Sequence, residues 1–276
     1  MLFSNNEKQT ENFPKLQING TNINHISKES DIQSVRMLGV YLDPKLNFRD
    51  FASKTLAKIS KSFFIINRSK KFIPENSLKL LYFALVHSQM EFASIFLHQN
   101  NKKTVSEIET LQKKIIRMIS GLDYAEHTTE AFIRHGILPF SRLIDYNVLK
   151  FMWQYECRRL PDGFNNEWPT NHSISSAAYE LRNRDDLNLP RTIRYNIDKM
   201  TYFSFPKLWN EKKSEISCNL DAEVFFPALK DHLLYDYKSK NECKNKNNDC
   251  YSCQITKDRM IKSVLKYLME LKSNSI

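Results

Sequence analysis

Residues 49–72 read RDFASKTLAKISKSFFIINRSKKF, and this stretch decides the expected fold. Apolar residues recur in it at steps of three and four, which indicates one buried stripe on an amphipathic helix. The stripe consists of Ala52, Leu56, Ile59, Phe63 and Ile66. Lys54, Lys58, Lys61 and Arg68 each follow one of these residues by two positions. At about 100° per residue, their basic side chains point the opposite way.

The same stretch is strongly basic. With Arg49, Lys70 and Lys71 it holds seven basic residues against one acid, Asp50, which leaves a net charge of +6. A row of cations on one helix face can follow the phosphates of a nucleic acid by counterion release, without reading its sequence. The alternative is an ordinary solvated helix face. The residues of this stretch alone favour neither interpretation.

Helical patterns continue after this stretch. Pro74 and Glu75 open a helix that runs from Leu78 to Leu97. Its run Leu80–Val86 is apolar all round, as expected of a helix inside a bundle.

Three more helices are predicted downstream. One starts at Thr104–Glu107, where a hydroxyl and a carboxylate can cap the first amides reciprocally, and it stops at Gly121. A short helix spans Thr129–His135 and ends at Gly136, and another begins at Pro139.

Strand patterns are confined to the first 45 residues. Residues 15–23 alternate apolar and polar around Asn19-Gly20, a dipeptide that tolerates the positive φ values of a tight turn, so we expect a β-hairpin there. Residues 35–42 are apolar on both parities and stop at Asp43-Pro44, which predicts a covered strand. The expected fold is therefore mainly α, with a small N-terminal β element, a helical bundle and a helical C-terminal region.

The last part of the chain changes character. Polar, irregular composition follows Leu160, and an aromatic cluster from Phe203 to Trp209 then indicates a packed segment. Residues 238–249 are rich in Lys and Asn and predict a mobile linker. A final amphipathic helix is outlined by Ile261, Val264, Leu265 and Leu268.

Composition bounds the class of protein. The 276 residues carry a formal net charge of +10, which favours polyanionic partners, although a basic protein without such a partner has the same balance. Only five glycines argue against a phosphate-cradling loop. The N-terminus lacks the regions of a signal peptide, and the run Leu80–Val86 is shorter than the roughly 20 residues that span a bilayer. We therefore expect an intracellular protein of the nucleus or cytoplasm, with no membrane partner.

Several motifs occur in a recognisable order. They are FSNN at 3–6, LQING at 16–20, VRMLGVYLD at 35–43, the helical patterns at 53–64, 78–96 and 105–121, GILPF at 136–140 and PKLWN at 206–210. In this order and spacing the chain resembles the part of a non-LTR, LINE-like retrotransposon reverse transcriptase that follows the catalytic palm hairpin. The likeness covers most of the chain, from Phe3 to about Trp209, although no single motif has the specificity of a catalytic signature.

The resemblance implies a division of the chain. Residues 1–45 would be a residual palm edge in which Leu38, Gly39 and Val40 resemble the primer-grip strand. Residues 46–121 would be a thumb-like helical bundle, residues 122–237 a helical C-terminal region, and residues 238–276 a linker with a Cys cluster and a terminal helix. Lys54, Lys58, Lys61, Arg68, Lys70 and Lys71 would then track RNA or RNA–DNA hybrid. The resemblance also implies a protein partner, namely the palm and fingers region of the parent enzyme, which this chain lacks.

The catalytic part of the family is not matched. Phosphoryl transfer by a polymerase requires carboxylates that clamp two metal ions about 4 Å apart, and in the family those carboxylates precede the segment that matches Phe3. The Asp-Asp pair here, Asp185-Asp186, stands among charged and loop-forming residues and predicts a solvated turn. We expect no catalytic residue, no Mg²⁺ of the parent enzyme and no polymerase activity from this chain alone.

A cysteine cluster marks the C-terminal tail. Cys250 and Cys253 form a Cys-x-x-Cys pair, with Cys243 upstream and His232 as the nearest candidate for a fourth ligand. Two thiolates on one turn are a common zinc half-site, so Zn²⁺ is the one cofactor that the sequence suggests. Free thiols in a flexible tail are the alternative.

Other reactive or aromatic residues have simpler interpretations. Five histidines lack a Ser or Cys partner at a spacing that would define a triad, so packing or surface roles are expected for His87, His98, His127, His135 and His172. Trp153, Trp168 and Trp209 could stack on bases, but an aromatic residue within an apolar stripe usually fills a core.

Three hypotheses of function follow. The first is a truncated reverse transcriptase remnant that binds RNA or RNA–DNA hybrid without extending it. The second is a helical adaptor that docks a partner protein through its apolar C-terminal helix and Cys-rich, zinc-binding tail. The third is a chain with no retained role.

Overall fold

The computed structural model describes residues 17–18, 20–22, 34–43, 46, 48–97, 102–164, 167–174, 183–189, 201–215 and 221–241. Helices dominate these residues, and the strands form two small antiparallel hairpins near the N-terminus. The predicted mainly α fold is confirmed.

The first hairpin pairs β1 (Gln17–Ile18) with β2 (Thr21–Asn22), in the register Gln17 to Asn22 and Ile18 to Thr21. Gly20, in the turn between them, has a φ of 76°. The hairpin predicted around Asn19-Gly20 is therefore confirmed, because the chain reverses where glycine tolerates positive φ.

The second hairpin replaces the covered strand expected at residues 35–42, and that prediction was wrong. β3 (Val35–Met37) pairs with β4 (Val40–Leu42) across a two-residue turn at Leu38-Gly39. Both turn residues have positive φ, 49° and 88°. An apolar run on both parities does not reveal a turn, and Leu38 is an uncommon residue for the left-handed region.

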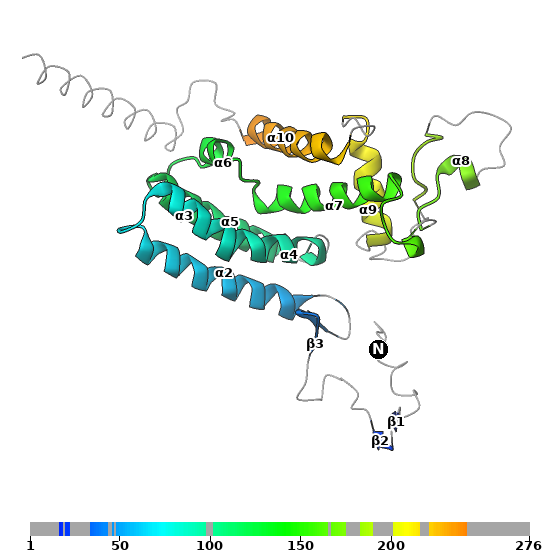
Figure 1. The fold of residues 1–276 in the computed structure, drawn as a ribbon, viewed down its shortest axis with the longest axis horizontal. Helices are drawn as coiled ribbons and strands as arrows, with labels where there is room; N and C mark the ends of the chain where they lie inside the picture. Colours follow the sequence, from blue (N-terminus) through cyan, green and yellow to red (C-terminus); the bar gives the residue numbers. More distant parts are fainter. Residues whose placement is uncertain are drawn as a thin grey trace, which may run out of the picture.

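Helix α2 (Arg49–Ser69) forms one edge of the helical body, as Figure 1 shows. Next to it lies a continuous helix made of α3 (Glu75–Tyr82), a π-helical turn η1 (Phe83–His87) and α4 (Ser88–Leu97). Helix α5 (Lys102–Ser120) packs against both. It ends at Gly121 as predicted, with a φ of 61°, but it begins before the expected cap at Thr104.

The run Leu80–Val86 was expected inside the bundle, and this prediction was wrong for one face of the helix. Tyr82 and Val86 are fully buried, whereas Leu80 is 70% exposed. The physical reason is that α2, α5 and the later helix α7 (Phe140–Glu156) cover only one side of the α3–η1–α4 helix.

The whole helix from Glu75 to Leu97 is long and apolar enough to cross a membrane by length and composition, which the sequence pattern of one short run did not suggest. The core helix of a helical bundle passes the same test. One face of this helix carries Tyr82, Val86, Met90 and Leu97, all buried in the protein core.

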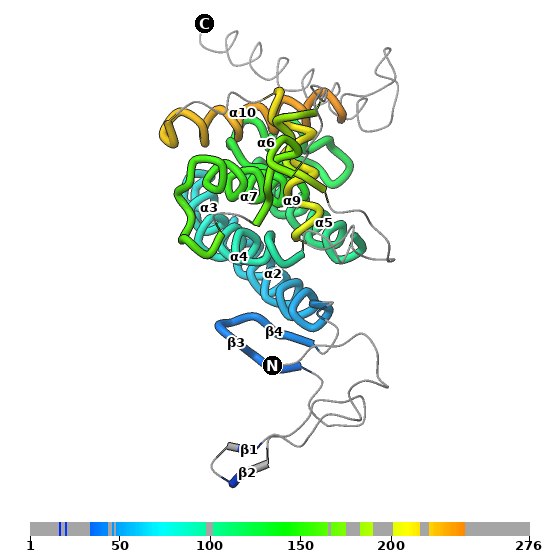
Figure 2. Tube along the Cα trace, turned by 90° about the vertical axis from the view of Figure 1, so that its right-hand side faces the viewer, coloured from blue at the N-terminus to red at the C-terminus, as the bar shows by residue number. Residues whose placement is uncertain are grey.

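Helix α7 stands at the centre of the second half of the body. It contacts α4, α5, α9 (Thr201–Lys212) and α10 (Ala222–Asn241). Figures 1 and 2 place α10 at the edge of the body opposite α2. The remaining helical elements are α6 (Thr129–His135), η2 (Asp162–Phe164) and α8 (Asn171–Ile174). The predicted helices that end at Gly136 and begin at Pro139 are thus confirmed.

One buried side chain joins three of these elements. Gln112 of α5 is fully buried, and its Nε2 donates to the Tyr82 hydroxyl (2.8 Å) and to the Leu138 carbonyl (2.9 Å). Its Oε1 accepts from the Phe140 amide at 2.8 Å, an amide of the first turn of α7 that has no intrahelical partner. Gln112 therefore fixes the start of α7 against α3 and α5.

The structure describes only part of the C-terminal region for which elements were predicted. Helix α10 continues to Asn241, so the first residues of the predicted linker at 238–249 are helical instead. The preceding Tyr237 packs its ring against Phe132 of α6, which anchors this end of the helix. The terminal amphipathic helix predicted around Ile261–Leu268 lies outside the described residues.

Candidate nucleic-acid interface

The two faces predicted for residues 49–72 are present on α2. Ala52, Ile59 and Ile66 are fully buried, and Leu56 and Phe63 are partly buried against the core. Phe51, Thr55 and Ser62 are buried as well, so the packed face is wider than the stripe suggested. The six basic residues predicted to bind nucleic acid are all exposed: Lys54, Lys58, Lys61, Arg68, Lys70 and Lys71.

The exposed cations share one side of the helix. At about 100° per residue, Lys54, Lys58, Lys61 and Arg68 fall within a sector of about 80°. Lys61 and Arg68 are seven residues apart, which corresponds to about 10 Å along the helix axis. Within the described residues, no ion pair involves Lys58, Lys61 or Arg68. Their charges remain available to an anionic ligand.

Lys54 differs from the other cations because it already has an aromatic contact. Its Nζ lies 3.2 Å from the centroid of the Tyr41 ring in β4. The sequence did not indicate this contact, because it joins two separate elements, the hairpin and the helix. Lys54 therefore belongs to the junction between hairpin and helix as well as to the basic face.

The residues that resemble a primer grip are brought together but have different environments. Leu38 is 91% exposed at the tip of the turn, and Val40 is buried. Gly39 lies against the ring of Phe92 in α4, where an added Cβ would come within 3.6 Å of it. The hairpin is thus seated on the α2–α4 end of the bundle, and its tip points an apolar side chain into solvent.

Aromatic rings hold this junction. Phe48 contacts Phe96 at a centroid distance of 5.7 Å, and Phe51 contacts Phe92 and Phe96 edge-on at 5.9 and 5.5 Å. Such edge-to-face pairs add about 0.5–1.5 kcal/mol each beyond their burial. The first turn of α2 is therefore well anchored beside the hairpin.

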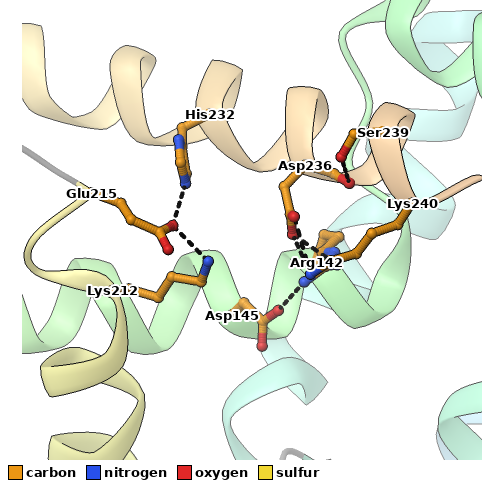
Figure 3. Close-up of polar contacts among 8 residues, drawn as sticks. All are labelled: Arg142, Asp145, Lys212, Glu215, His232, Asp236, Ser239 and Lys240. Carbon is orange, nitrogen blue, oxygen red and sulfur yellow. Dashed lines mark hydrogen bonds and ion pairs between the residues drawn. The ribbon is translucent and has the colours of Figure 1, made fainter.

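The predicted zinc site is described only at His232. Its Nε2 lies 3.1 Å from Glu215 Oε2, which also pairs with Lys212 at 2.6 Å, as Figure 3 shows. Cys243, Cys250 and Cys253 lie outside the described residues. Among the residues that the structure does describe, no group of three or more His, Cys, Asp or Glu could hold a metal ion.

Figure 3 also shows a second polar cluster beside His232, and this one fastens α10 to α7. Arg142 pairs with Asp145 at 3.0 Å and with Asp236 at 2.9 Å, and Asp236 pairs with Lys240 at 3.0 Å. Burial is the largest single influence on the pKa of Asp236, and it raises this pKa. The hydrogen bond from Lys240 and the charge of Arg142 together outweigh burial, so the net shift of the pKa is downward. These pairs connect Arg142 of α7 to Asp236 of α10.

Asp185 and Asp186 lie in a turn, as predicted. Lys213 pairs with Asp186 at 2.7 Å and donates to the Asp185 carbonyl at 2.7 Å. The nearby Asn210 fixes the same segment, because its side chain donates to the Leu187 carbonyl (2.8 Å) and accepts from the Leu187 amide (3.0 Å). These contacts give the aspartates a structural role.

One serine and histidine contact was missed by sequence reasoning. Ser120 Oγ and His135 Nε2 lie 2.9 Å apart, and Glu75 is 3.6 Å from the same nitrogen. In a catalytic triad the acid holds the opposite ring nitrogen, so this arrangement lacks that relay. Burial lowers the pKa of His135, followed by the charge of Arg134. The contact joins the C-terminal end of α5 to the C-terminal end of α6, which is a packing role.

The tryptophans fill the core, as the packing interpretation predicted. Trp153, Trp168 and Trp209 are all buried. Trp153 stacks on Phe225 at 5.0 Å, and Trp168 donates its indole N–H to the Tyr202 carbonyl at 2.8 Å. None of the three can offer a ring face to a base.

No protein-family model, curated protein or solved structure matches this chain.

Proposed function

We propose that this chain is a remnant of a non-LTR retrotransposon reverse transcriptase, and that it binds RNA or RNA–DNA hybrid through the outer face of α2 without polymerising by itself. The observation that carries the proposal is the set of Lys58, Lys61 and Arg68. They are exposed on one helix face whose opposite side is packed, and they have no ion-pair partner within the described residues. The order of motifs supplies the family, as a resemblance.

Electrostatics sets the expected behaviour of this binding. Phosphate contacts release counterions, so log affinity should fall linearly with log salt, by about 0.9 for each contact on a duplex. The net charge of +10 adds long-range attraction toward a polyanion. Binding should depend little on nucleotide sequence, because contacts to phosphate carry no base information.

The test is filter binding of an RNA–DNA hybrid at several salt concentrations. The triple variant Lys58→Met, Lys61→Met and Arg68→Met should lower the salt slope by about 2 to 3. Lys54 is left intact because its contact with Tyr41 makes it part of the hairpin junction. The matched control is Lys207→Met, an exposed lysine on α9. The proposal would be wrong if the affinity did not depend on salt concentration, or if the control variant lowered the salt slope as much as the triple variant does.

A second candidate function is the helical adaptor, and the C-terminal helix and Cys-rich tail that were expected to dock its partner lie outside the described residues. Exposed apolar side chains elsewhere favour this candidate. Leu80, Phe92 and Ile95 are exposed apolar residues along the α3–η1–α4 helix. The adaptor hypothesis predicts that the triple variant binds nucleic acid as well as the original protein does. The same filter-binding series therefore separates the two functions.

A further inference from the structure

An exposed aromatic ring lies among the cations of α2. Phe64 is 63% exposed, although its neighbours on the other side of the helix are buried. It follows Lys61 by three residues and precedes Arg68 by four, and residues at these spacings are neighbours on a helix surface, about 5–6 Å apart at Cβ. Its ring is supported by an edge-on contact with Phe63 at 5.6 Å. Phe64 therefore stands between two cations.

The end of α2 repeats this arrangement. Phe72 is 86% exposed and directly follows Lys70 and Lys71. The turn that presents it is ordered by hydrogen bonds from the amides of Phe72 (2.9 Å) and Ile73 (3.1 Å) to the Ser69 carbonyl. A second exposed ring thus directly follows two exposed lysines in the chain, on a turn that is held by backbone hydrogen bonds.

Isolated exposed apolar residues are common and need no ligand. What distinguishes these two rings is their position among exposed cations. A single nucleic acid strand offers alternating phosphates and unstacked base faces, which cations and aromatic rings bind respectively. A duplex hides its base faces inside the stack, so it can use the cations but not the rings.

We propose that the outer face of α2 and the turn that follows it bind a single nucleic acid strand, whose phosphates contact Lys61, Arg68 and Lys71 while its unpaired bases stack on Phe64 and Phe72. This inference rests on the proposed function. It narrows the expected ligand from RNA or RNA–DNA hybrid to a nucleic acid strand with unpaired bases. The rings carry no polar group, so the surface does not select a base or the sugar 2′-hydroxyl.

The experiment measures equilibrium binding of the full chain to a labelled 12-nucleotide mixed-sequence strand and to its blunt duplex, in RNA and DNA versions. The strand should bind more tightly than the duplex. Phe64→Ala and Phe72→Ala should each weaken strand binding about tenfold and leave duplex binding unchanged. The slope of log affinity against log salt should stay constant in both variants, whereas Lys61→Met should reduce it by about 0.7.

Two controls make the test specific. Tyr235→Ala removes a ring whose exposure, 73%, lies between those of Phe64 and Phe72, from α10 at the opposite edge of the body, and should leave all affinities unchanged. Because Phe64 and Phe72 are exposed, their variants should also keep the thermal midpoint of the original protein. A RNA strand and a DNA strand should bind with similar affinity.

Several outcomes would overturn the inference. They are equal affinity for strand and duplex, unchanged strand binding in both Phe variants, or strict dependence on one sugar. Loss of binding to anionic vesicles in Phe64→Ala, with oligonucleotide binding intact, would assign the rings to a membrane surface instead. If the Phe variants are silent but Lys61→Met lowers the salt slope, the proposed function stands and only this inference fails. If the original protein binds no nucleic acid, both fail.

Discussion

The Nζ of Lys54 lies 3.2 Å from the centroid of the Tyr41 ring, and this contact joins the β3–β4 hairpin to α2. Tyr41 is partly buried, whereas Lys54 is exposed. A cation over an aromatic ring at such a site contributes about 0.5–1 kcal/mol. The hairpin that resembles a primer grip and the helix that carries the basic face are therefore mechanically coupled.

Removing the ring should loosen the hairpin. We expect Tyr41→Leu to speed hydrogen exchange of the β3–β4 amides, while Tyr41→Phe, which keeps the ring, should leave exchange unchanged. The free energy of unfolding should fall by about 1 kcal/mol or less in the leucine variant, because one partly exposed contact is lost. Equal exchange rates in the two variants would show that the contact does not hold the hairpin.

The turn at Leu38-Gly39 should be improvable. Leu38 has a φ of 49°, in the left-handed region. Holding a residue with a Cβ in this region costs roughly 1 kcal/mol of stability. Leu38→Asn creates the Asn-Gly pair that two-residue hairpins favour, so hairpin amides should exchange more slowly. Denaturant unfolding should show a gain of about 0.5–1 kcal/mol. A loss of stability would mean that the Leu38 side chain makes a contact that its exposure conceals.

Gln112 should be among the most sensitive core positions. Gln112→Leu leaves the Tyr82 hydroxyl, the Leu138 carbonyl and the Phe140 amide without their buried partner. Each unsatisfied group costs about 1–3 kcal/mol, so we expect at least about 3 kcal/mol of lost stability in urea titrations. Gln154→Leu, at a half-buried position of α7, is the matched control and should cost less than about 1 kcal/mol. Similar losses in both would argue against this role.

Stability should fall under mildly acidic conditions through His135. Burial lowers the pKa of this side chain below its ordinary value of 6.5, and the charge of Arg134 lowers it further, although Glu75 opposes the shift. The unfolded chain therefore binds a proton that the folded chain excludes, and stability is lost as pH falls below about 6.5. His135→Gln, compared with the original protein between pH 7.5 and 5.5, should show a shallower decline. Parallel curves would exclude His135 as a source of the pH dependence.

Metal content tests the zinc hypothesis. If Cys243, Cys250, Cys253 and His232 hold zinc, purified protein should contain about one zinc ion per chain, and Cys250→Ser with Cys253→Ser should remove it. His232→Gln should weaken retention during dialysis against a chelator. The histidine would first have to leave Glu215, with which it pairs at 3.1 Å. A metal-free original protein would favour free thiols.

Local signals in the chain predicted much of the fold. The amphipathic period of α2, the turn at Asn19-Gly20 and the helix ends at Gly121 and Gly136 all depend on residues within a few positions of one another. The outward side of the basic residues was predictable for the same reason, because helical geometry alone separates Lys61 from Ile59 and Ile66.

What only the tertiary structure decided is which faces are covered and which distant residues meet. Leu80 and Phe64 are apolar like buried Tyr82 and Ile66, and they are exposed because none of the described helices covers them. The contacts of Lys54 with Tyr41 and of Ser120 with His135 join separate elements. A sequence period specifies the direction of a side chain from its own helix, but the presence of a partner depends on how the other helices pack, which no local pattern encodes.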